Sequence, residues 1–475
     1  MTLPGEFPPD SPAGRPWFAL GVNYPYVWTH GCDIGPNQIA AADPSRPNGT
    51  SFGSGRIAQL RADFERLRSW GCQVVRIWAF EQGEGLRWRQ RGADWIVAGI
   101  DPAFLDNVRR ITALAEETGL RIYWTLLTAA SFEEGEQPTE ADRRRAGAFQ
   151  LLLRSDWAQE RFFLHAVHSF ADALCAHRGG VFALDLMNEP DMLWPLAPCN
   201  IREALSRSSA DGRAAFEAYL AVSRLGSLVN AGAAFYFRRR ELRVLRFLRR
   251  MALSLRAHLA RGGRRLLLSI GFAYINTITR NRDLLDDCLD FHDFHSYDLL
   301  DVTHATPNIP RWTDTGKACI IGECGLGGQF VKDTLGMSLI GQSPFQFPPR
   351  TTLQDIFRIQ AELVRHFMST ARQNGFGGCL IWEYGRQFER VFGLERSLTE
   401  RGTCRLEGNA RRMEHCLDWA DRIPLLWKQR EGVAPPSDQC VHLGSSPSSE
   451  ELCGRPAVRD IRAFSEHLTS NNLRL

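Results

Sequence analysis

The chain has 475 residues, of which 44% are hydrophobic and 23% are charged, a composition typical of a globular protein with a large core. Its formal net charge of +3 is small for this length, so electrostatics give no reason to expect a nucleic-acid partner. The sequence contains no uninterrupted apolar run of the length that spans a membrane, and residues 1–10 lack the features of a secretory signal. The twelve cysteines form no CxxC pair. These features predict a reduced, cytoplasmic protein with no membrane partner, and a secreted form stays open as the alternative.

Eight short apolar runs follow one another along the chain, and continuous apolar runs are typical of parallel strands that are covered on both faces. In chain order they are 18–23, 73–79, 121–127, 181–187, 264–270, 290–295, 318–322 and 378–382. Helical patterns lie between them, most clearly at 56–70, 101–119 and 353–374. In the second of these, Asp101 can cap the helix, Pro102 suits the first turn, and Gly119 can end it. Alternating strands and helices predict a (β/α)8 TIM barrel, with an open doubly wound sheet as the alternative.

The segments that follow several of these strands are long. They cover 24–55, 128–155, 190–240 and 324–351. Barrel enzymes build their sites at the carboxyl ends of the strands, so long βα loops at this end predict an enclosed pocket. We expect the barrel to occupy residues 1–430, with a helical insertion at about 190–240. Residues 431–475 are rich in Pro, Ser and Gly and are expected to form a peripheral C-terminal extension.

Two of the apolar runs end in a glutamate. The fourth run leads into Asn188, Glu189 and Pro190, and the seventh leads into Glu323. A carboxyl group at the end of a buried strand is directed into the cleft at that end of the barrel. Cleavage of a glycosidic bond needs two such groups, because one protonates the leaving oxygen while the other attacks or stabilises the sugar cation. The pair therefore predicts a sugar-processing enzyme.

Other side chains at the strand ends extend this pattern. They are Arg76 in the second run, His295 and Tyr297 after the sixth, and Trp382 at the end of the eighth. In this order, and with the two glutamates, the residues resemble clan A glycoside hydrolases, particularly glycoside hydrolase family 5, the cellulase and mannanase group. The resemblance covers roughly residues 18–420. It implies a retaining double displacement, with Glu189 as the acid/base and Glu323 as the nucleophile.

The resemblance also implies roles for the surrounding residues. Arg76 would keep Glu323 charged, and Tyr297 would donate a hydrogen bond to it. His295 would orient the substrate or that tyrosine, Asn188 would bind the sugar 2-hydroxyl, and Trp382 would lie under the sugar ring. The family carries a histidine after the third strand, whereas residues 121–128 contain none. His30 could take a comparable place.

The end of the first strand supplies further candidates for substrate binding, because Asn23 and Tyr24 lie at the mouth of the barrel. Together with other aromatic residues they could form a wall on which sugars stack: Trp78, Phe80, Trp194 and Tyr384. Carboxylates near strand ends could bind sugar hydroxyls: Glu81, Asp191, Asp298 and Glu383.

Metal and cofactor chemistry find little support in the sequence. His292, Asp293 and His295 could bind a metal, but neighbouring residues on a strand point to opposite faces, and no HExxH or Cys-His set accompanies them. Residues 53–58 match GxGxxA, yet a loop precedes them instead of a strand, so they are interpreted as a helix start. We therefore expect neither a metal nor another cofactor.

The sequence thus predicts a retaining glycosidase that acts on a β-linked sugar. Long loops favour exo-action on short oligosaccharides or small glycosides, and its expected partner is carbohydrate. Endo-action on glucan or mannan and transglycosylation are the enzymatic alternatives. A catalytically silent, sugar-binding barrel is the alternative from another class.

Overall fold

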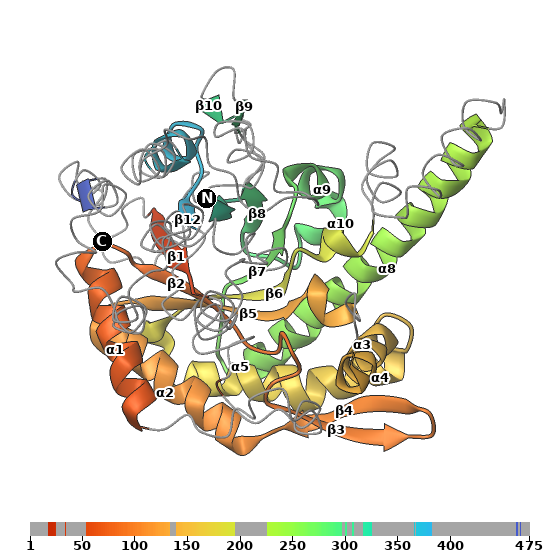
Figure 1. Cartoon of the computed structure of the whole chain (residues 1–475), viewed down its shortest axis with the longest axis horizontal. Coiled ribbons are helices and arrows are strands. Elements are labelled where there is room, and N and C mark those ends of the chain that lie inside the picture. The colour runs from red at the N-terminus through yellow and green to blue at the C-terminus, as the bar shows by residue number, and fades with distance from the viewer. Residues whose placement is uncertain are drawn as a thin grey trace, which may run out of the picture.

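The computed structural model describes residues 18–24, 34, 54–133, 139–194, 226–296, 300–301, 306–307, 317–324, 365, 367–381, 462–463 and 466. Eight parallel strands close into a barrel, which has helices around its outside (Figure 1). In barrel order the strands are β1 (Ala19–Asn23), β2 (Val74–Trp78), β5 (Arg121–Thr128), β6 (Val181–Asn188), β7 (Leu268–Phe272), β8 (His292–Ser296), β11 (Cys319–Cys324) and β12 (Gly378–Ile381), which pairs back with β1. Each strand lies on a run predicted from the sequence. The closed sheet confirms the (β/α)8 barrel and excludes the open alternative.

The described helices are α1 (Ser54–Ser69), α2 (Pro102–Thr118), α3 (Glu140–Leu152), α4 (Asp156–Phe162), α5 (His168–Cys175), α8 (Gly226–Arg261), α9 (Ile275–Arg280) and α10 (Arg282–Leu285). Shorter helical segments are η2 (Ala129–Phe132), the π-helical η3 (Phe163–Val167), η4 (Arg178–Gly180) and η5 (Pro190–Leu193). Two small antiparallel sheets lie outside the barrel: β3 (Leu86–Arg91) with β4 (Asp94–Ile100), and β9 (Leu300–Asp301) with β10 (Thr306–Pro307). Among the helices that the structure describes, none is both long enough and apolar enough to cross a membrane.

Helix α2 shows how local sequence sets the length of an element. The Asp101 side chain accepts a hydrogen bond from the Ala103 amide at 2.9 Å, and Pro102 occupies the first turn. The helix ends at Gly119, which has a φ of 73°, a conformation that glycine adopts without steric cost. The predicted caps are therefore confirmed.

The inside of the barrel is a packed apolar layer with a polar layer above it. The apolar layer comprises Ala19, Val74, Tyr123, Phe182, Ala183, Phe291, Ala318, Ile320 and Leu380. Side chains alternate between the two faces of a strand, so the residue two positions after an inward-facing one also faces inward. Two positions after Val74, Ala183 and Phe291 come Arg76, Asp185 and Asp293, each fully buried. The alternation of side chains thus gathers three ionisable residues in one layer, directly below the carboxyl ends of the strands.

Several segments differ from the sequence-based expectations. Within the segment 128–155, which was expected to be a loop, Thr139 caps α3 in a capping box with Asp142. The hairpin of β3 and β4 follows β2 and was not predicted. Because α8 begins at Gly226, residues 226–240 belong to the helix between β6 and β7 and not to the insertion. Residues 195–225, much of the expected 353–374 helix and nearly all of 431–475 lie outside the described residues.

Candidate active site

Arg76 is the centre of the polar layer. Its side chain is fully buried and its two terminal nitrogens contact four acceptors. One nitrogen, Nη1, donates to Glu323 Oε1 at 2.5 Å and to Asn23 Oδ1 at 3.2 Å. The other, Nη2, donates to Asp185 Oδ2 at 2.6 Å and to Asn188 Oδ1 at 2.8 Å. Burial opposes the charge of Arg76, but Asp185 and Glu323 outweigh it and raise the pKa of the guanidinium further. Arg76 therefore stays cationic and favours the ionised form of Glu323.

Glu323 reaches this layer through an irregularity in β11. Ile320 faces the barrel interior, so regular alternation would turn Gly322 inward and Glu323 outward. The pairing of β11 with β8 shifts register between Ile321 and Glu323, as a β-bulge does, and this shift brings the carboxylate inward. Gly322 is required here, because a Cβ at this position would lie 2.0 Å from Asp293 Oδ1.

Glu189 is held by an unusual backbone conformation directly after β6. Its φ of 49° and ψ of 48° make it the one non-glycine residue with a positive φ in the described part of the chain. A left-handed conformation costs about 1–2 kcal/mol for a residue with a Cβ. The Glu189 amide donates to Gly271 O on β7 at 2.6 Å, and Pro190 begins η5 immediately afterwards. Backbone strain of this kind clusters at functional sites, where it fixes the direction of a side chain.

The environment of Glu189 differs from that of Glu323. Burial raises the pKa of Glu189 to about 7, with Arg76 acting in the opposite direction. The Glu189 side chain is 27% exposed, whereas that of Glu323 is 4% exposed. Near neutral pH, Glu189 can therefore carry a proton and exchange it with a ligand, while Glu323 faces a fixed positive charge.

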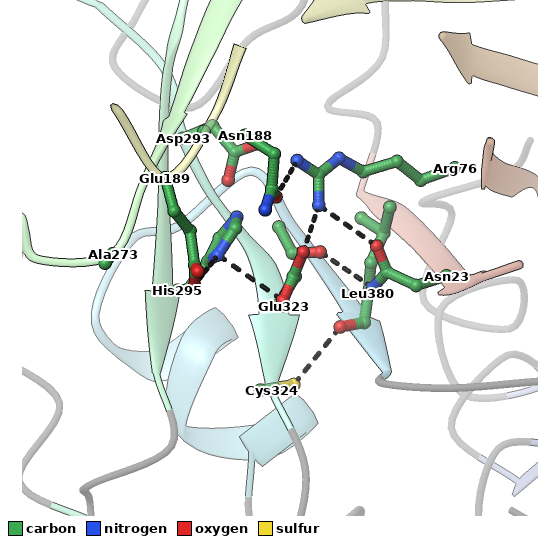
Figure 2. Close-up of polar contacts among 12 residues, drawn as sticks. Asn23, Arg76, Asn188, Glu189, Ala273, Asp293, His295, Glu323, Cys324 and Leu380 are labelled. Carbon is green, nitrogen blue, oxygen red and sulfur yellow. Dashed lines mark hydrogen bonds and ion pairs between the residues drawn. The ribbon is translucent and has the colours of Figure 1, made fainter. Parts of the chain in front are cut away.

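His295 lies between the two glutamates (Figure 2). Its Nδ1 is 2.8 Å from Glu189 Oε1 and 3.4 Å from Glu323 Oε2. Burial lowers the pKa of His295 to about 4, so the ring is neutral near pH 7. Its Nε2 has no hydrogen-bond partner among the described residues. The neutral ring can bridge the two carboxyl groups without adding a charge.

The two glutamates are close enough to act on one bond. One carboxyl oxygen of Glu189, one of Glu323 and a ring nitrogen of His295 all lie within 4.8 Å of one another. Carboxyl groups about 5–5.5 Å apart are typical of double displacement, and a larger separation makes room for a water molecule between sugar and base.

The same three side chains are the one group in the described residues whose donor atoms are close enough to hold a metal ion. Nitrogen and carboxylate oxygen are both ligands that zinc accepts. The metal set of His292, Asp293 and His295, which the sequence analysis set aside, is not formed. His292 faces Asp286, with a distance of 2.8 Å between Nε2 and Oδ1, whereas Asp293 accepts from Tyr123 Oη at 2.8 Å inside the barrel.

Asn23 and Asn188 both lie in the site. The Asn23 amide donates to Gly322 O at 2.9 Å, next to the bulge that positions Glu323. Asn188 accepts from Arg76 through Oδ1, which fixes the orientation of its amide. Arg76 thus holds both asparagines next to the two glutamates.

Several expected substrate contacts lie elsewhere. The Tyr24 hydroxyl donates to Asp63 on α1 at 2.9 Å, so this side chain lies behind the barrel wall and the expectation of a sugar contact is wrong. Asp191 is 1% exposed and accepts from the amides of Ala273 and Tyr274 and from the Thr277 hydroxyl, which ties η5 to the start of α9. Burial raises the pKa of Asp191 to about 7, and the hydrogen bonds oppose this. Its carboxylate is used within the protein and not for sugar hydroxyls.

The aromatic wall expected at the barrel mouth is not formed by its described members. Trp78, Phe80 and Trp194 are each at most 2% exposed. Trp78 lies at the site but packs against Arg76, whose Cζ is 4.5 Å from the centre of its ring. Phe80 packs against Phe104 and Phe170 in the core between barrel and helices. The remaining candidates His30, Tyr297, Trp382 and Tyr384 lie outside the described residues.

Sequence reasoning missed Asp185 and Tyr123 as parts of the site. Asp185 accepts from Arg76, from Thr125 Oγ1 at 3.0 Å and from the Gly271 amide at 3.0 Å. Burial raises the pKa of Asp293, the partner of Tyr123, well above its usual value, which favours the neutral acid. In the sequence, these two residues stand out as isolated polar side chains in otherwise apolar strands, Asp185 with a carboxyl group and Tyr123 with a hydroxyl group.

Comparison with known proteins gives distant similarities. No protein-family model and no curated protein matches the chain. Among solved structures, it is similar to a β-mannanase from the blue mussel Mytilus edulis, with 17% identity, a TM-score of 0.45, and coverage of 78% of this chain and 88% of that one. It is also similar to a β-1,4-mannanase from the sea hare Aplysia kurodai, with 16% identity, a TM-score of 0.45, and coverage of 85% and 98%. For an exo-β-1,4-mannosidase from Opitutaceae bacterium strain TAV5 the identity is 13%, the TM-score 0.47, and the coverage 100% and 63%. Likeness this distant does not assign a reaction, which has to be argued from the site.

Proposed function

We propose that this chain is a retaining β-glycosidase in which Glu189 is the acid/base and Glu323 is the nucleophile. The observation that carries the proposal is the separation of the two carboxyl groups, whose oxygens lie within 4.8 Å of each other. Their unlike environments support it, because burial raises the pKa of Glu189 to about 7 while Glu323 is bound by the Arg76 guanidinium.

In the first step, Glu323 attacks the anomeric carbon as Glu189 gives its proton to the leaving oxygen. Arg76 binds Oε1 of Glu323, and Oε2 lies 3.4 Å from Nδ1 of His295, the ring that also contacts Glu189. The step forms an ester between Glu323 and the sugar. In the second step Glu189, now ionised, takes a proton from water, which attacks the same carbon and releases Glu323.

Asn188 and His295 fit supporting roles in this reaction. The amide of Asn188, which Arg76 orients through Oδ1, is placed to donate to the sugar 2-hydroxyl, a contact that strengthens in the transition state. Neutral His295 holds Glu189 in place at 2.8 Å and leaves the charge of Glu323 unchanged. We propose exo-action on short oligosaccharides or small glycosides as the mode, on the grounds of the long βα connections. Endo-action on glucan or mannan and transglycosylation would use the same residues.

A panel of nitrophenyl and methyl β-glycosides tests the proposal, with product stereochemistry read by NMR. We expect turnover of at least one sugar with retained configuration, and its loss in Glu323→Ala. Glu189→Ala is expected to lower turnover of the methyl glycoside by about 10²–10⁴-fold, and that of the nitrophenyl glycoside less, because nitrophenolate leaves without a proton. Glu65→Ala, which removes an exposed carboxyl group on α1, is the control.

The pH profile and the sugar-binding alternative complete this test. Because Glu189 has to be protonated in the first step, kcat/KM should fall as the pH rises through about 7. An inverted product would contradict the nucleophilic role of Glu323. Binding of oligosaccharides without any turnover, and with equal affinity in Glu323→Ala, would favour the non-catalytic barrel.

A further inference from the structure

Two free thiols lie in contact directly behind the nucleophile. Cys324 follows Glu323 on β11, and its Sγ is 3.2 Å from Sγ of Cys379 on the neighbouring strand β12. Cys324 Sγ also lies 3.5 Å from Leu380 O, the contact drawn beside Glu323 in Figure 2. Both residues are fully buried in the core between the barrel and its helices. Among the described cysteines this is the one sulfur–sulfur contact.

The backbone at this pair is irregular. The pairing of β11 with β12 shifts register between Ile321 and Cys324, in the same bulge that turns Glu323 into the barrel. A disulfide has an S–S distance of about 2.05 Å, so the sulfurs would have to approach from the observed 3.2 Å. Any movement of Cys324 is passed to Glu323 through a single peptide bond. The contact of Glu323 with Arg76 is only 2.5 Å long and would be disturbed by it.

We propose that Cys324 and Cys379 are a modification site, at which a peroxide forms a reversible disulfide that displaces Glu323. In the reaction, one thiol is oxidised to a sulfenic acid, and the other thiol displaces water from it to form the S–S bond. In total the two thiols lose two protons and two electrons, and hydrogen peroxide is reduced to two molecules of water. A small-molecule thiol reverses the change through thiol–disulfide exchange.

Burial sets the rate of this modification. It raises the pKa of Cys324 well above the usual range of a thiol, and the protonated thiol reacts slowly with peroxide. Oxidation should therefore be accelerated by mild urea, which opens the core locally, and the disulfide should form without global unfolding.

Mass spectrometry tests the proposal without reference to glycosidase activity. After hydrogen peroxide treatment and alkylation, trypsin releases residues 318–332, which contain Cys319 and Cys324, and residues 373–386, which contain Cys379. We expect these two peptides to be linked in the wild type and in Cys319→Ala, and to be separate in Cys379→Ala and Cys379→Ser. Two variants are made at position 379 so that the test can still be carried out if one of them does not fold. Linkage that disappears in Cys319→Ala, or no linkage with or without urea, would overturn the proposal.

Activity provides the second readout, which rests on the proposed function. Oxidised wild-type enzyme should lose turnover at least tenfold and recover it with dithiothreitol, whereas Cys379→Ser should be unaffected by peroxide. Full activity of a fully linked enzyme would overturn the displacement of Glu323. If the chain hydrolyses no glycoside, the shift of Glu323 is read from a crystal structure of the oxidised protein, and an unchanged Glu323–Arg76 contact would again refute it.

Discussion

Replacement of Glu189 by glutamine should stabilise the protein increasingly as the pH rises from about 4.5 to about 7. The ordinary pKa of 4.5 for this carboxyl is raised to about 7 in the folded state by burial. A carboxyl whose pKa is higher when folded stabilises the fold while it is protonated, and this contribution is lost as the pH rises towards the folded value. The rise in pKa corresponds to about 3 kcal/mol of unfolding free energy, and the loss is complete above about pH 7. Glutamine keeps the shape of the acid but cannot ionise.

Urea denaturation of wild type and Glu189→Gln at pH 5 and at pH 8.5 measures this difference. The variant should gain about 2.5 kcal/mol relative to wild type between the two pH values, because a small part of the effect is already present at pH 5, and its activity is lost. Comparing the two pH values cancels any effect of the amide that does not depend on pH. Glu65→Gln, at an exposed position on α1, controls for the loss of one negative charge. A difference that stays constant between the two pH values would refute the argument that burial of Glu189 destabilises its ionised form.

Further predictions concern Arg76 and the bulge. Arg76→Lys keeps the charge but cannot bind four acceptors at once, so kcat should fall by about 10²-fold with a smaller change in KM, measured by steady-state kinetics. A kcat within threefold of wild type would contradict the positioning role of the guanidinium. Gly322→Ala should cost about 1–3 kcal/mol in urea denaturation, because its Cβ would meet Asp293. Gly147→Ala, in α3 with no atom within 4 Å of the new Cβ, should instead gain about 1 kcal/mol, and equal effects of the two changes would show that crowding is not the cause.

The sequence sufficed for the barrel and for the two glutamates, because both follow from local patterns. Continuous apolar runs predict strands covered on both faces, and Glu189 and Glu323 stand where such runs end. The partners of Arg76 were only partly predictable. Asp185 was part of a run interpreted as apolar, and its contact with Arg76 bridges 109 positions of the chain. For Tyr24, the sequence predicted a sugar contact that the structure does not have. An aromatic residue at the end of a strand suggests a place at the barrel mouth, and only the packing shows that its hydroxyl faces Asp63 on α1.

The charges of the site, taken together, match the reaction that we propose. Asp293 and Glu189 have pKa values raised by burial and His295 has one lowered by burial, so burial favours the uncharged form of all three groups. The Arg76 guanidinium forms ion pairs with both Asp185 and Glu323, so one cation is shared between two carboxyl groups. Glycosidic cleavage passes through a transition state in which the sugar becomes cationic. A fixed negative charge, held in a buried site before the sugar arrives, stabilises that cation more than it stabilises the neutral substrate. Asp185 supports this arrangement, because it shares the Arg76 cation with Glu323 and so leaves more of the Glu323 charge to act on the sugar cation.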